Sequence, residues 1–314
     1  MKFSFSADQL AFRDAFRELL ERECTPDVAR ESHVPELWKR VGEMGVLGIR
    51  RELDEVDLVL LLEEAGRALL PGPFLATAAV GVPALTEAGQ KEWLDPVSSG
   101  DAVLAVGLQG EPVAFADVAD VLLLGSDGVL HAVPRDRVQL ERVQSFSRAR
   151  PRFRVHWEPT DSERLAVSVE EAFERAALAA AAEAVGVASR LIDMGAEYAK
   201  QREQFGAPIG SFQAVKHLLA NALVKLEFAR PAVYAAAWSL AEGVPDQARA
   251  VSLAKAMATD ATMLAARNSL QVHGAIGYTE EHHLHLWLKA AWALGLAYGD
   301  ATWHRTRVAE SVVT

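Results

Sequence analysis

The stretch EYAKQREQFGAPIGSFQAVKHLL, Glu197 to Leu219, decides how the second half of the chain folds. Two glycines and a proline interrupt what are otherwise two apolar helical runs. We expect Gly206 to end the first helix at its C′ position, because glycine adopts the left-handed conformation at little cost. Pro208 prevents the helix from continuing, and Ser211 is expected to cap the next one. The stretch therefore predicts two long helices joined by a tight turn.

The same turn carries side chains that suit an anionic ligand. Arg202 stands just before it, and a guanidinium beside a helix N-terminus is a good phosphate clamp. Gln213 adds an amide that can hydrogen-bond a heteroaromatic edge. The alternative is a plain helix connector in which Arg202 forms an ion pair with Glu203 or Glu197.

Outward from this turn, the chain divides into three zones of different composition. Residues 1–101 have a helical pattern. Residues 102–165 form a small β domain of short β-branched segments, with a hairpin signal, GSDG, at 125–128. Residues 166–314 are rich in alanine and predict a four-helix bundle, with helices at 168–202, 211–241, 245–273 and 282–311. Helices and strands do not alternate, which argues against a Rossmann sheet.

The overall composition limits the partners and the compartment. The 314 residues carry a net charge of −11, which argues against a nucleic-acid partner because phosphate neutralisation needs clustered Lys and Arg. There is a single cysteine, Cys24, so no internal disulfide forms, as is usual in a reducing compartment. The sequence shows neither a signal-peptide core nor a strongly apolar run of membrane-spanning length. We expect a cytoplasmic protein without a membrane segment, in which Cys24 has no chemical role.

A second unusual turn lies in LQVHGAIGYTEEHHLHLW, Leu270 to Trp287. Gln271, Gly274 and Gly277 fall between the third and fourth expected helices. Two glycines three residues apart allow another group to approach the backbone closely. No strand precedes this G-x-x-G, so it is not a dinucleotide-binding fingerprint.

The fourth expected helix is unusually rich in histidine, tryptophan and leucine. Three histidines stand at its start, and we expect them to cap the helix or bond within the core rather than hold a metal, since nothing completes a site: His282, His283 and His285. Three tryptophans are expected to share this helix and to pack in a core or an interface: Trp287, Trp292 and Trp303. Four leucines are too many for one apolar stripe and favour burial against another subunit: Leu286, Leu288, Leu294 and Leu296.

Together the two turns resemble a pair of motifs of the acyl-CoA dehydrogenase family. The first is carried by YAKQREQFGAPIGSFQAVKHLLA (Tyr198–Ala220) and the second by LQVHGAIGYTEEHHLHLWLKAA (Leu270–Ala291). The resemblance implies a mainly α fold with a small β domain: an N-terminal helical domain, a reduced middle β domain and a C-terminal four-helix bundle. It also implies an oxidoreductase that acts on the CH–CH bond of an acyl-CoA thioester, with FAD as cofactor.

Members of this family bind FAD across a subunit interface, with the ADP half of the cofactor reaching the bundle of the neighbouring subunit. The resemblance therefore implies six cofactor-binding residues on this chain: Arg202, Phe205, Gln213, Gln271, Gly274 and Gly277. Arg202 would offset the charge of the pyrophosphate, and Gly274 would let the backbone approach it.

Other features of the family pattern are missing. The β domain normally carries a segment like T-E-P-x-x-G-S-D against the flavin, and here only Glu111-Pro112 hints at it. The family's usual base is a glutamate that removes the α-proton of the thioester. The corresponding slot is occupied by Tyr298, which is a poor base near neutral pH, and Asp300 lies two residues further on.

Two glutamates of the first bundle helix are further candidates for the base. In some members the base comes from this helix, and the equivalent slot here is Ala176, with Glu174 about half a turn away. Glu183 lies in the same Ala-rich helix and could have a raised pKa, although pairing with Arg190 or Arg230 is the plainer interpretation.

The retained residues are those that a subunit offers to its neighbour's flavin, and the missing ones are those that it offers to its own. This division resembles the short subunit of heteromeric (α2β2) acyl-CoA dehydrogenases of actinobacterial steroid side-chain degradation. It implies a heterotetramer in which a second acyl-CoA dehydrogenase subunit supplies the catalytic Glu and the flavin-ring pocket. The substrate would be an acyl-CoA, and an electron-transfer flavoprotein would be the electron acceptor. Two alternatives stay open: a homomeric dehydrogenase whose base is Glu183, Asp300 or Glu174, and a structural subunit without FAD.

Overall fold

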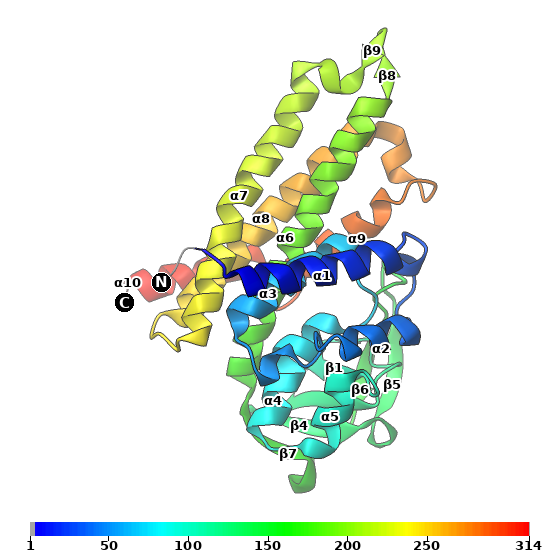
Figure 1. The fold of residues 1–314 in the computed structure, drawn as a ribbon. Helices are drawn as coiled ribbons and strands as arrows, with labels where there is room; N and C mark the ends of the chain where they lie inside the picture. Colours follow the sequence, from blue (N-terminus) through cyan, green and yellow to red (C-terminus); the bar gives the residue numbers. More distant parts are fainter. Residues whose placement is uncertain (1–3, 314) are drawn as a thin grey trace. The chain divides into compact units, whose positions relative to one another are not determined.

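The computed structural model describes residues 4–313, which divide into two compact units (Figure 1). One unit combines residues 62–69 with residues 180–313, and the remaining described residues form the other. The first unit contains most of the expected bundle, together with a short segment of the N-terminal helices. The three domains expected from the sequence, divided near residues 101 and 165, remain a prediction.

Helices make up the chain before residue 102. They are α1 (Ala7–Glu23), α2 (Pro35–Glu43), α3 (Glu55–Ala68), α4 (Val82–Glu87) and α5 (Lys91–Ser99), with a π-helical segment, η3 (Ala76–Gly81), before α4. The start of α1 is fixed by a reciprocal capping box, in which the Ser6 hydroxyl accepts from the Gln9 amide at 3.1 Å and the Ser6 amide donates to the Gln9 side chain at 2.9 Å. The helical zone expected from the sequence is confirmed.

Seven short strands follow, in two sheets around one core. They are β1 (Leu104–Gly107), β2 (Val113–Ala114), β3 (Val121–Ser126), β4 (Val129–Pro134), β5 (Gln139–Val143), β6 (Arg152–His156) and β7 (Arg164–Ser168). One sheet has the order β1-β3-β4-β7 and the other β2-β6-β5. The predicted hairpin joins β3 to β4, and Asp127 and Gly128 both have the positive φ of a two-residue loop. Leu122, Val133 and Phe153 lie in the core that the two sheets share.

Five helices, rather than four, make up the rest of the chain. They are α6 (Val169–Gln201), α7 (Gln213–Ala241), α8 (Gln247–His273), α9 (Leu284–Leu296) and α10 (Ala301–Val313). The first three confirm the helices expected from the sequence. The prediction of a single helix over 282–311 was wrong, because the helix ends at Leu296. Tyr298 and Gly299, which follow it, have φ values of +53° and +89°. Trp303 therefore lies on α10, whereas the other two tryptophans lie on α9.

Small residues bring α3 and α6 into direct backbone contact within the bundle unit. A Cβ added at Gly186 would lie 1.8 Å from the Glu63 carbonyl oxygen, and one added at Gly66 would lie 2.0 Å from the Glu183 carbonyl oxygen. The Glu63 carboxylate forms an ion pair with Arg230 and accepts a hydrogen bond from Tyr234 at 2.8 Å. These contacts join α3, α6 and α7 into one rigid framework.

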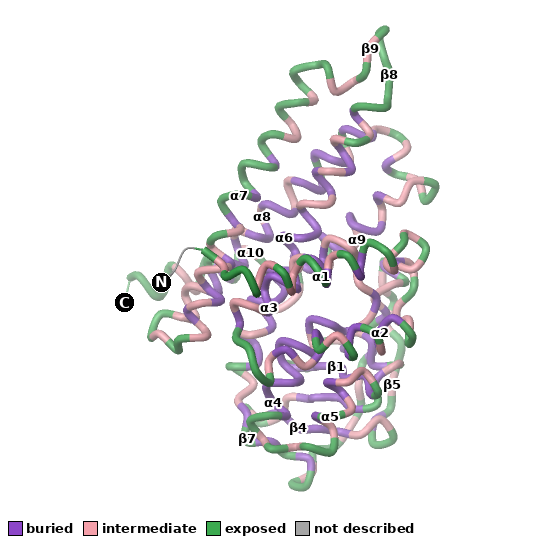
Figure 2. The backbone as a smooth tube through the Cα atoms, viewed as in Figure 1, coloured by how far each residue is buried: buried purple, intermediate pink, exposed green. Residues whose placement is uncertain are grey.

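One end of the bundle unit is strongly exposed (Figure 2). A two-stranded ribbon, β8 (Glu203–Gln204) with β9 (Ala207–Pro208), projects between the end of α6 and the start of α7 (Figure 1). All residues from Lys200 to Gly206 are exposed. Among the described residues, no helix combines the length and the hydrophobicity that crossing a membrane requires.

Candidate cofactor-binding site

The turn that bears Arg202 is a short hairpin rather than a helix cap. Helix α6 ends at Gln201, and the Arg202 amide still donates to the Tyr198 carbonyl at 2.9 Å. Phe205 and Gly206 then form the two-residue loop between β8 and β9, with φ values of +53° and +78°. Gly206 is therefore not at the C′ position of the helix, because four residues of ribbon separate the two. The positive φ that glycine favours is used in the hairpin loop instead.

The expected cap at Ser211 was also wrong. The Ser211 hydroxyl donates to the Pro208 carbonyl at 2.7 Å, inside a 3₁₀ turn, η6 (Ile209–Ser211). Helix α7 starts one residue later than a Ser211 cap would place it, with Phe212 at the N-cap and no side chain bonding the first amides. The first turn of α7 thus keeps donor groups that a ligand could use.

The polar side chains of this turn are exposed and available. Among residues 4–313, the Arg202 guanidinium forms no ion pair, so the expected pairing with Glu203 or Glu197 is not observed. Glu197 pairs instead with Arg190, at 3.0 Å. The Phe205 ring is 94% exposed and meets Phe212 edge-on, with the ring centroids 6.2 Å apart. Arg202 and Phe205 are therefore both exposed on this turn, where a ligand could reach them.

The second turn uses its two glycines for different purposes. Gly274 follows α8 with a φ of +62°, and no atom lies within 4 Å of where a Cβ would stand. Gly277 is buried in a 3₁₀ segment, η7 (Gly274–Tyr278), where a Cβ would lie 2.9 Å from Leu270 and 3.1 Å from the His273 side chain. Both glycines were expected to let another group approach the backbone. The space for such an approach exists at Gly274 and not at Gly277. Gln271 is exposed on the last turn of α8.

Direct contacts hold the two turns at the same end of the unit. The Tyr198 and His273 rings stack with centroids 4.5 Å apart, which joins the last turn of α6 to the last residue of α8. The Asn268 side chain donates to the Leu218 carbonyl of α7 at 2.7 Å, and the Ser269 hydroxyl donates to the Leu191 carbonyl of α6 at 2.7 Å. The structure thus places Tyr198 and His273, which are 75 positions apart in sequence, on neighbouring helix ends.

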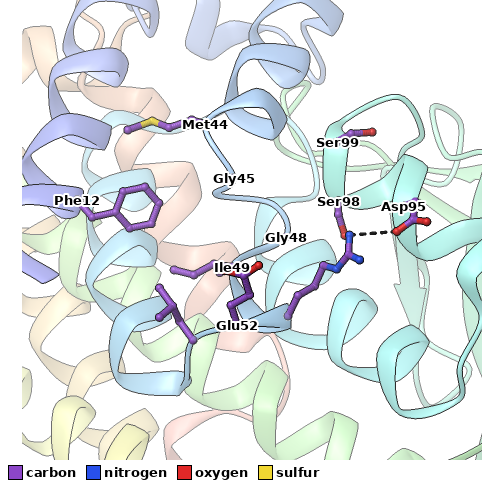
Figure 3. Close-up of a pocket in the computed structure, with 11 residues that line it drawn as sticks. Phe12, Met44, Gly45, Gly48, Ile49, Glu52, Asp95, Ser98 and Ser99 are labelled. Carbon is purple, nitrogen blue, oxygen red and sulfur yellow. Dashed lines mark ion pairs between the residues drawn. The ribbon is translucent and has the colours of Figure 1, made fainter. Parts of the chain in front are cut away.

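A pocket in the other unit does not coincide with this site. It has a volume of about 530 Å³ and lies between α1, the segment after α2, and α5 (Figure 3). An ion pair between Arg51 and Asp95, at 3.1 Å, crosses its polar side, and Phe12 and Ile49 line its apolar side. The Ser98 hydroxyl at its edge is buried and has no hydrogen-bond partner. None of the six predicted cofactor residues lines this pocket.

Comparison with known proteins identifies the fold around these turns. The sequence matches the acyl-CoA dehydrogenase C-terminal domain over residues 166–313 and the acyl-CoA dehydrogenase N-terminal domain over residues 6–101. It is 32% identical over 302 residues to the acyl-CoA dehydrogenase IpdE2 of Mycolicibacterium smegmatis, a similarity that covers 91% of this chain and 93% of that protein. The chain belongs to the acyl-CoA dehydrogenase family. The class that the resemblance implied, an FAD-dependent acyl-CoA oxidoreductase, is confirmed.

Two solved structures of this family show the same fold. The ChsE4-ChsE5 complex from Mycobacterium tuberculosis contains a chain with a TM-score of 0.87 and 23% identity, covering 100% of this chain and 99% of that one. A variant of the Tcur3481-Tcur3483 steroid ACAD gives a TM-score of 0.85 and 24% identity, covering 98% of each chain. The predicted fold class, mainly α with a small β domain, is confirmed.

The groups at the two turns fit the ADP half of FAD. Arg202 offers a bidentate cation without a competing carboxylate, which suits a pyrophosphate. Gln213 and Gln271 are exposed amides that can bond an adenine edge or a ribose. Open space at the Gly274 Cβ position would let phosphate oxygens reach the backbone. The assignment of these residues to FAD stays a prediction.

The predicted base slot falls in the break between α9 and α10. Tyr298 has a φ of +53°, and its carbonyl accepts a hydrogen bond from His304 Nε2 at 2.8 Å. Asp300 accepts from the Trp303 amide at 2.8 Å and so caps α10. The Asp300 carboxylate therefore has a structural task in this chain, which counts against it as a base.

Lys255 is a buried cation that sequence reasoning missed. It lies on α8, is 0% exposed, and donates to the carbonyls of Leu294 at 3.0 Å and Gly299 at 3.1 Å and to the Thr259 hydroxyl at 3.2 Å. Burial lowers the pKa of Lys255 to about 8, partly opposed by the nearby Asp300. Its ammonium ties the C-terminus of α9 to the turn that bears Tyr298. A lysine within the apolar run SLAKAMA is the only signal that the sequence offered.

The candidate glutamates of α6 differ in burial. Glu174 is 5% exposed, whereas Glu183 is only half-buried. The two arginines expected near Glu183 pair with other residues, Arg190 with Glu197 and Arg230 with Glu63. A catalytic role for either glutamate stays a prediction.

The histidines at the start of α9 act as local hydrogen-bonding groups. His282 Nδ1 accepts from the Leu284 amide at 3.1 Å and so caps the helix. Nowhere in residues 4–313 do three or more His, Cys, Asp or Glu side chains gather in a way that could hold a metal ion. Trp287 is buried and donates from Nε1 to the Arg67 carbonyl at 3.0 Å, whereas Trp292 is 39% exposed.

Proposed function

We propose that this chain is one subunit of a heteromeric acyl-CoA dehydrogenase that oxidises an acyl-CoA between its α and β carbons. This proposal rests on a contrast between the Arg202 turn and the segment that bears Tyr298. The Arg202 turn keeps its full set of anion-binding groups, with the guanidinium unpaired among the described residues. The predicted base slot holds Tyr298, and the nearby Asp300 is used as a helix cap.

In this proposal the chain binds and orients the cofactor, and its partner subunit removes the proton from the substrate. FAD, when bound, supplies the acceptor for the hydride that leaves the β carbon of the substrate. Arg202 neutralises pyrophosphate charge, Gln213 and Gln271 fix the adenosine, and Phe205 covers it from water. A second acyl-CoA dehydrogenase subunit supplies the glutamate that removes the α-proton and the pocket for the flavin ring. This division follows from the missing T-E-P-x-x-G-S-D segment and from the tyrosine at position 298.

Exposed apolar side chains support a partner subunit. Three of the four leucines that suggested an intersubunit face are buried within this chain, so that part of the expectation was wrong, and only Leu296 is exposed, at 67%. Phe228 on α7 is 69% exposed and Trp303 on α10 is 43% exposed. Large apolar groups left in water on several helices of one unit favour association with another chain.

Two structurally related proteins support the substrate class and the assembly. One of them is a complex of two differently named chains, and the other is described as a steroid ACAD. We propose by analogy a bulky acyl-CoA, such as a steroid side-chain thioester, as substrate. An electron-transfer flavoprotein would reoxidise the cofactor, and the cytoplasm is the expected compartment.

Coexpression tests this function. The chain would be produced alone and together with each longer acyl-CoA dehydrogenase chain of the same genome, and the purified proteins assayed for flavin absorbance and for acyl-CoA oxidation. We expect the chain alone to be colourless and inactive, and the copurified complex to be yellow and active. A yellow, active chain on its own would refute the heteromeric proposal.

The burial of Glu174 supports a second candidate, a homomeric dehydrogenase whose base comes from α6. Glu174 is 5% exposed, so its side chain is held inside the fold rather than in water. In that case Glu174→Gln would abolish acyl-CoA oxidation by the chain purified alone, and Glu183→Gln would not. A third candidate, a structural subunit without FAD, would be supported if Arg202→Ala left the FAD content of the complex unchanged.

A further inference from the structure

Three aromatic rings in mutual contact connect the Arg202 turn to the Gly274 turn. Tyr198 lies one helical turn before Arg202, and His273 directly precedes Gly274. Their rings are stacked, with centroids 4.5 Å apart and an interplanar angle of 21°. His282 meets both rings edge-on, with centroids 4.6 Å from His273 and 6.1 Å from Tyr198. The turn that bears Arg202 and the turn that bears Gly274 thus share one aromatic contact.

The surroundings of His273 favour the neutral form of its ring, with the proton on Nδ1. The side chain is 3% exposed, and its Nδ1 lies 2.7 Å from the Ser269 carbonyl, which can only accept, so Nδ1 carries the proton. In the neutral ring Nε2 is then unprotonated, and it is buried without a hydrogen-bond partner in the described part of the chain. Adding a second proton would bury an N–H group that has no acceptor.

His282 opposes the same protonation. Its Nδ1 accepts from the Leu284 amide at 3.1 Å, and this bond is lost if that nitrogen takes a proton. Burial lowers the pKa of both rings. For His273, the hydrogen bond to the Ser269 carbonyl raises the pKa and the charge of His282 lowers it. For His282, the charge of His283 lowers the pKa further. Among the described residues, the groups that act on this pair are the Tyr198 ring, the Ser269 carbonyl and the His283 imidazole, and none of them is a carboxylate.

We propose that His273 is a positioning residue of the cofactor site, which in its neutral form locks the Arg202 turn against the Gly274 turn. Protonation of the imidazole pair places two like charges side by side in a buried contact, and the rings separate. Arg202 and the Gly274 backbone then lose the relative placement that lets both bind one pyrophosphate. This inference rests on the proposed function, because it assumes that the two turns grip the ADP half of FAD.

The direction of the pH effect follows from linkage. The unfolded chain titrates these histidines near 6.5, and the folded chain titrates them at lower pH. The contribution of the neutral stack is therefore fully present above pH 6.5. It is lost as the pH falls from 6.5 toward the folded-state pKa values. FAD binding should weaken over the same interval.

Flavin affinity as a function of pH tests the inference. The coexpressed complex would be stripped of flavin and titrated with FAD, following flavin fluorescence, between pH 8 and pH 5.5. We expect the wild-type Kd to rise about tenfold, the factor that corresponds to 1.4 kcal/mol. His273→Phe keeps the stack without a titrating group, so its Kd should stay within about twofold of wild type at pH 8 and change by less than about twofold with pH. His156→Phe, on the exposed surface of β6, should follow the wild type.

Two further variants separate positioning from simple packing. His273→Ala removes the stack and should weaken FAD binding at every pH, whereas His273→Phe restores it. His282→Asn keeps an acceptor for the Leu284 amide but removes the second ring, so the acid effect should shrink while binding at pH 8 is retained. A His273→Phe complex that weakens in acid as much as the wild type would overturn the inference, and so would a wild type without pH dependence.

A measurement without flavin separates this inference from the proposed function. The Ile209 amide donates to the Arg202 carbonyl at 2.8 Å, so its hydrogen exchange reports whether the turn stays closed. In the apo chain, the protection of Ile209, corrected for intrinsic exchange, should fall below pH 6.5 in the wild type and not in His273→Phe. If the complex binds no FAD at pH 8, the proposed function fails while this exchange result still decides the inference. Equal loss of protection in both proteins would overturn it.

Discussion

Replacing Lys255 with methionine should remove a pH dependence of stability that the wild-type chain shows above pH 8. The folded-state pKa of Lys255 is about 8, because burial disfavours the ammonium, whereas the ordinary value is 10.5. Between these values the unfolded chain holds a proton that the folded chain has released. The free energy of unfolding therefore rises with pH across this interval.

The size of the effect follows from the difference between the two pKa values. One pKa unit corresponds to 1.36 kcal/mol, so Lys255 should add about 3 kcal/mol to the free energy of unfolding between pH 8 and pH 10.5. At pH 7 the methionine variant leaves the Leu294 and Gly299 carbonyls without this donor. A buried polar group without a partner costs about 1–3 kcal/mol, and relief of the buried charge offsets part of it. Two such carbonyls cost about 2–6 kcal/mol, and relief of a buried charge worth about 3 kcal/mol is subtracted, so we expect Lys255→Met to be less stable at pH 7 by at most about 3 kcal/mol.

Urea unfolding at pH 7, 8, 9 and 10, followed by far-UV circular dichroism, measures both quantities. Lys91→Met, which changes an exposed lysine at the start of α5, is the matched control and should follow the wild type at each pH. The stability difference between the wild type and Lys255→Met should widen by about 2 kcal/mol or more from pH 8 to pH 10. A difference that stays constant over this range would refute a buried, destabilised ammonium at Lys255.

Three other perturbations have defined outcomes. Burial lowers the pKa of His304 to about 4, so the wild type should lose about 3 kcal/mol of unfolding free energy as the pH falls from 6.5 to 4, and His304→Gln should lack this loss in the same urea assay. Gly186→Ala places a Cβ 1.8 Å from the Glu63 carbonyl and should lower the thermal midpoint by several degrees or more, whereas Lys200→Ala on the same helix should not. Burial raises the pKa of the half-buried Cys24 thiol to about 12, so Ellman's reagent should label it more slowly in the native chain than after denaturation at the same pH, and equal rates would contradict the raised pKa.

Local patterns in the sequence were enough to predict most of the helices and strands. Long apolar periodicity predicted α6, α7 and α8, and the Asp127-Gly128 pair predicted the β3–β4 hairpin. These features depend on neighbours in sequence, so the residues themselves carry the signal. The Ser6–Gln9 capping box of α1 is equally local, since both partners lie within four positions.

Features that depend on distant contacts were missed. The break before α10 places a tyrosine at positive φ, and this conformation is held by Lys255 and His304 rather than by local propensity. Ser211 has a good capping side chain, but a 3₁₀ turn gives its hydroxyl a nearer carbonyl at Pro208. The motifs identified Arg202 and Gly274 as neighbours of one cofactor. The Tyr198–His273 stack that joins them involves helices separated by the whole of α7, and no local pattern reveals it.

The flavin content of the copurified complex, with and without Arg202, tests the central claim most directly. The account predicts one FAD for each pair of unlike chains in the wild-type complex. It also predicts that Arg202→Ala loses most of this FAD, while Arg190→Ala, which breaks an ion pair with Glu197 and a cation–π contact with Trp287, keeps it. Full FAD occupancy in the Arg202→Ala complex, or one FAD bound to every copy of this chain expressed alone, would contradict the claim that this turn grips a flavin whose reactive ring lies in a partner subunit.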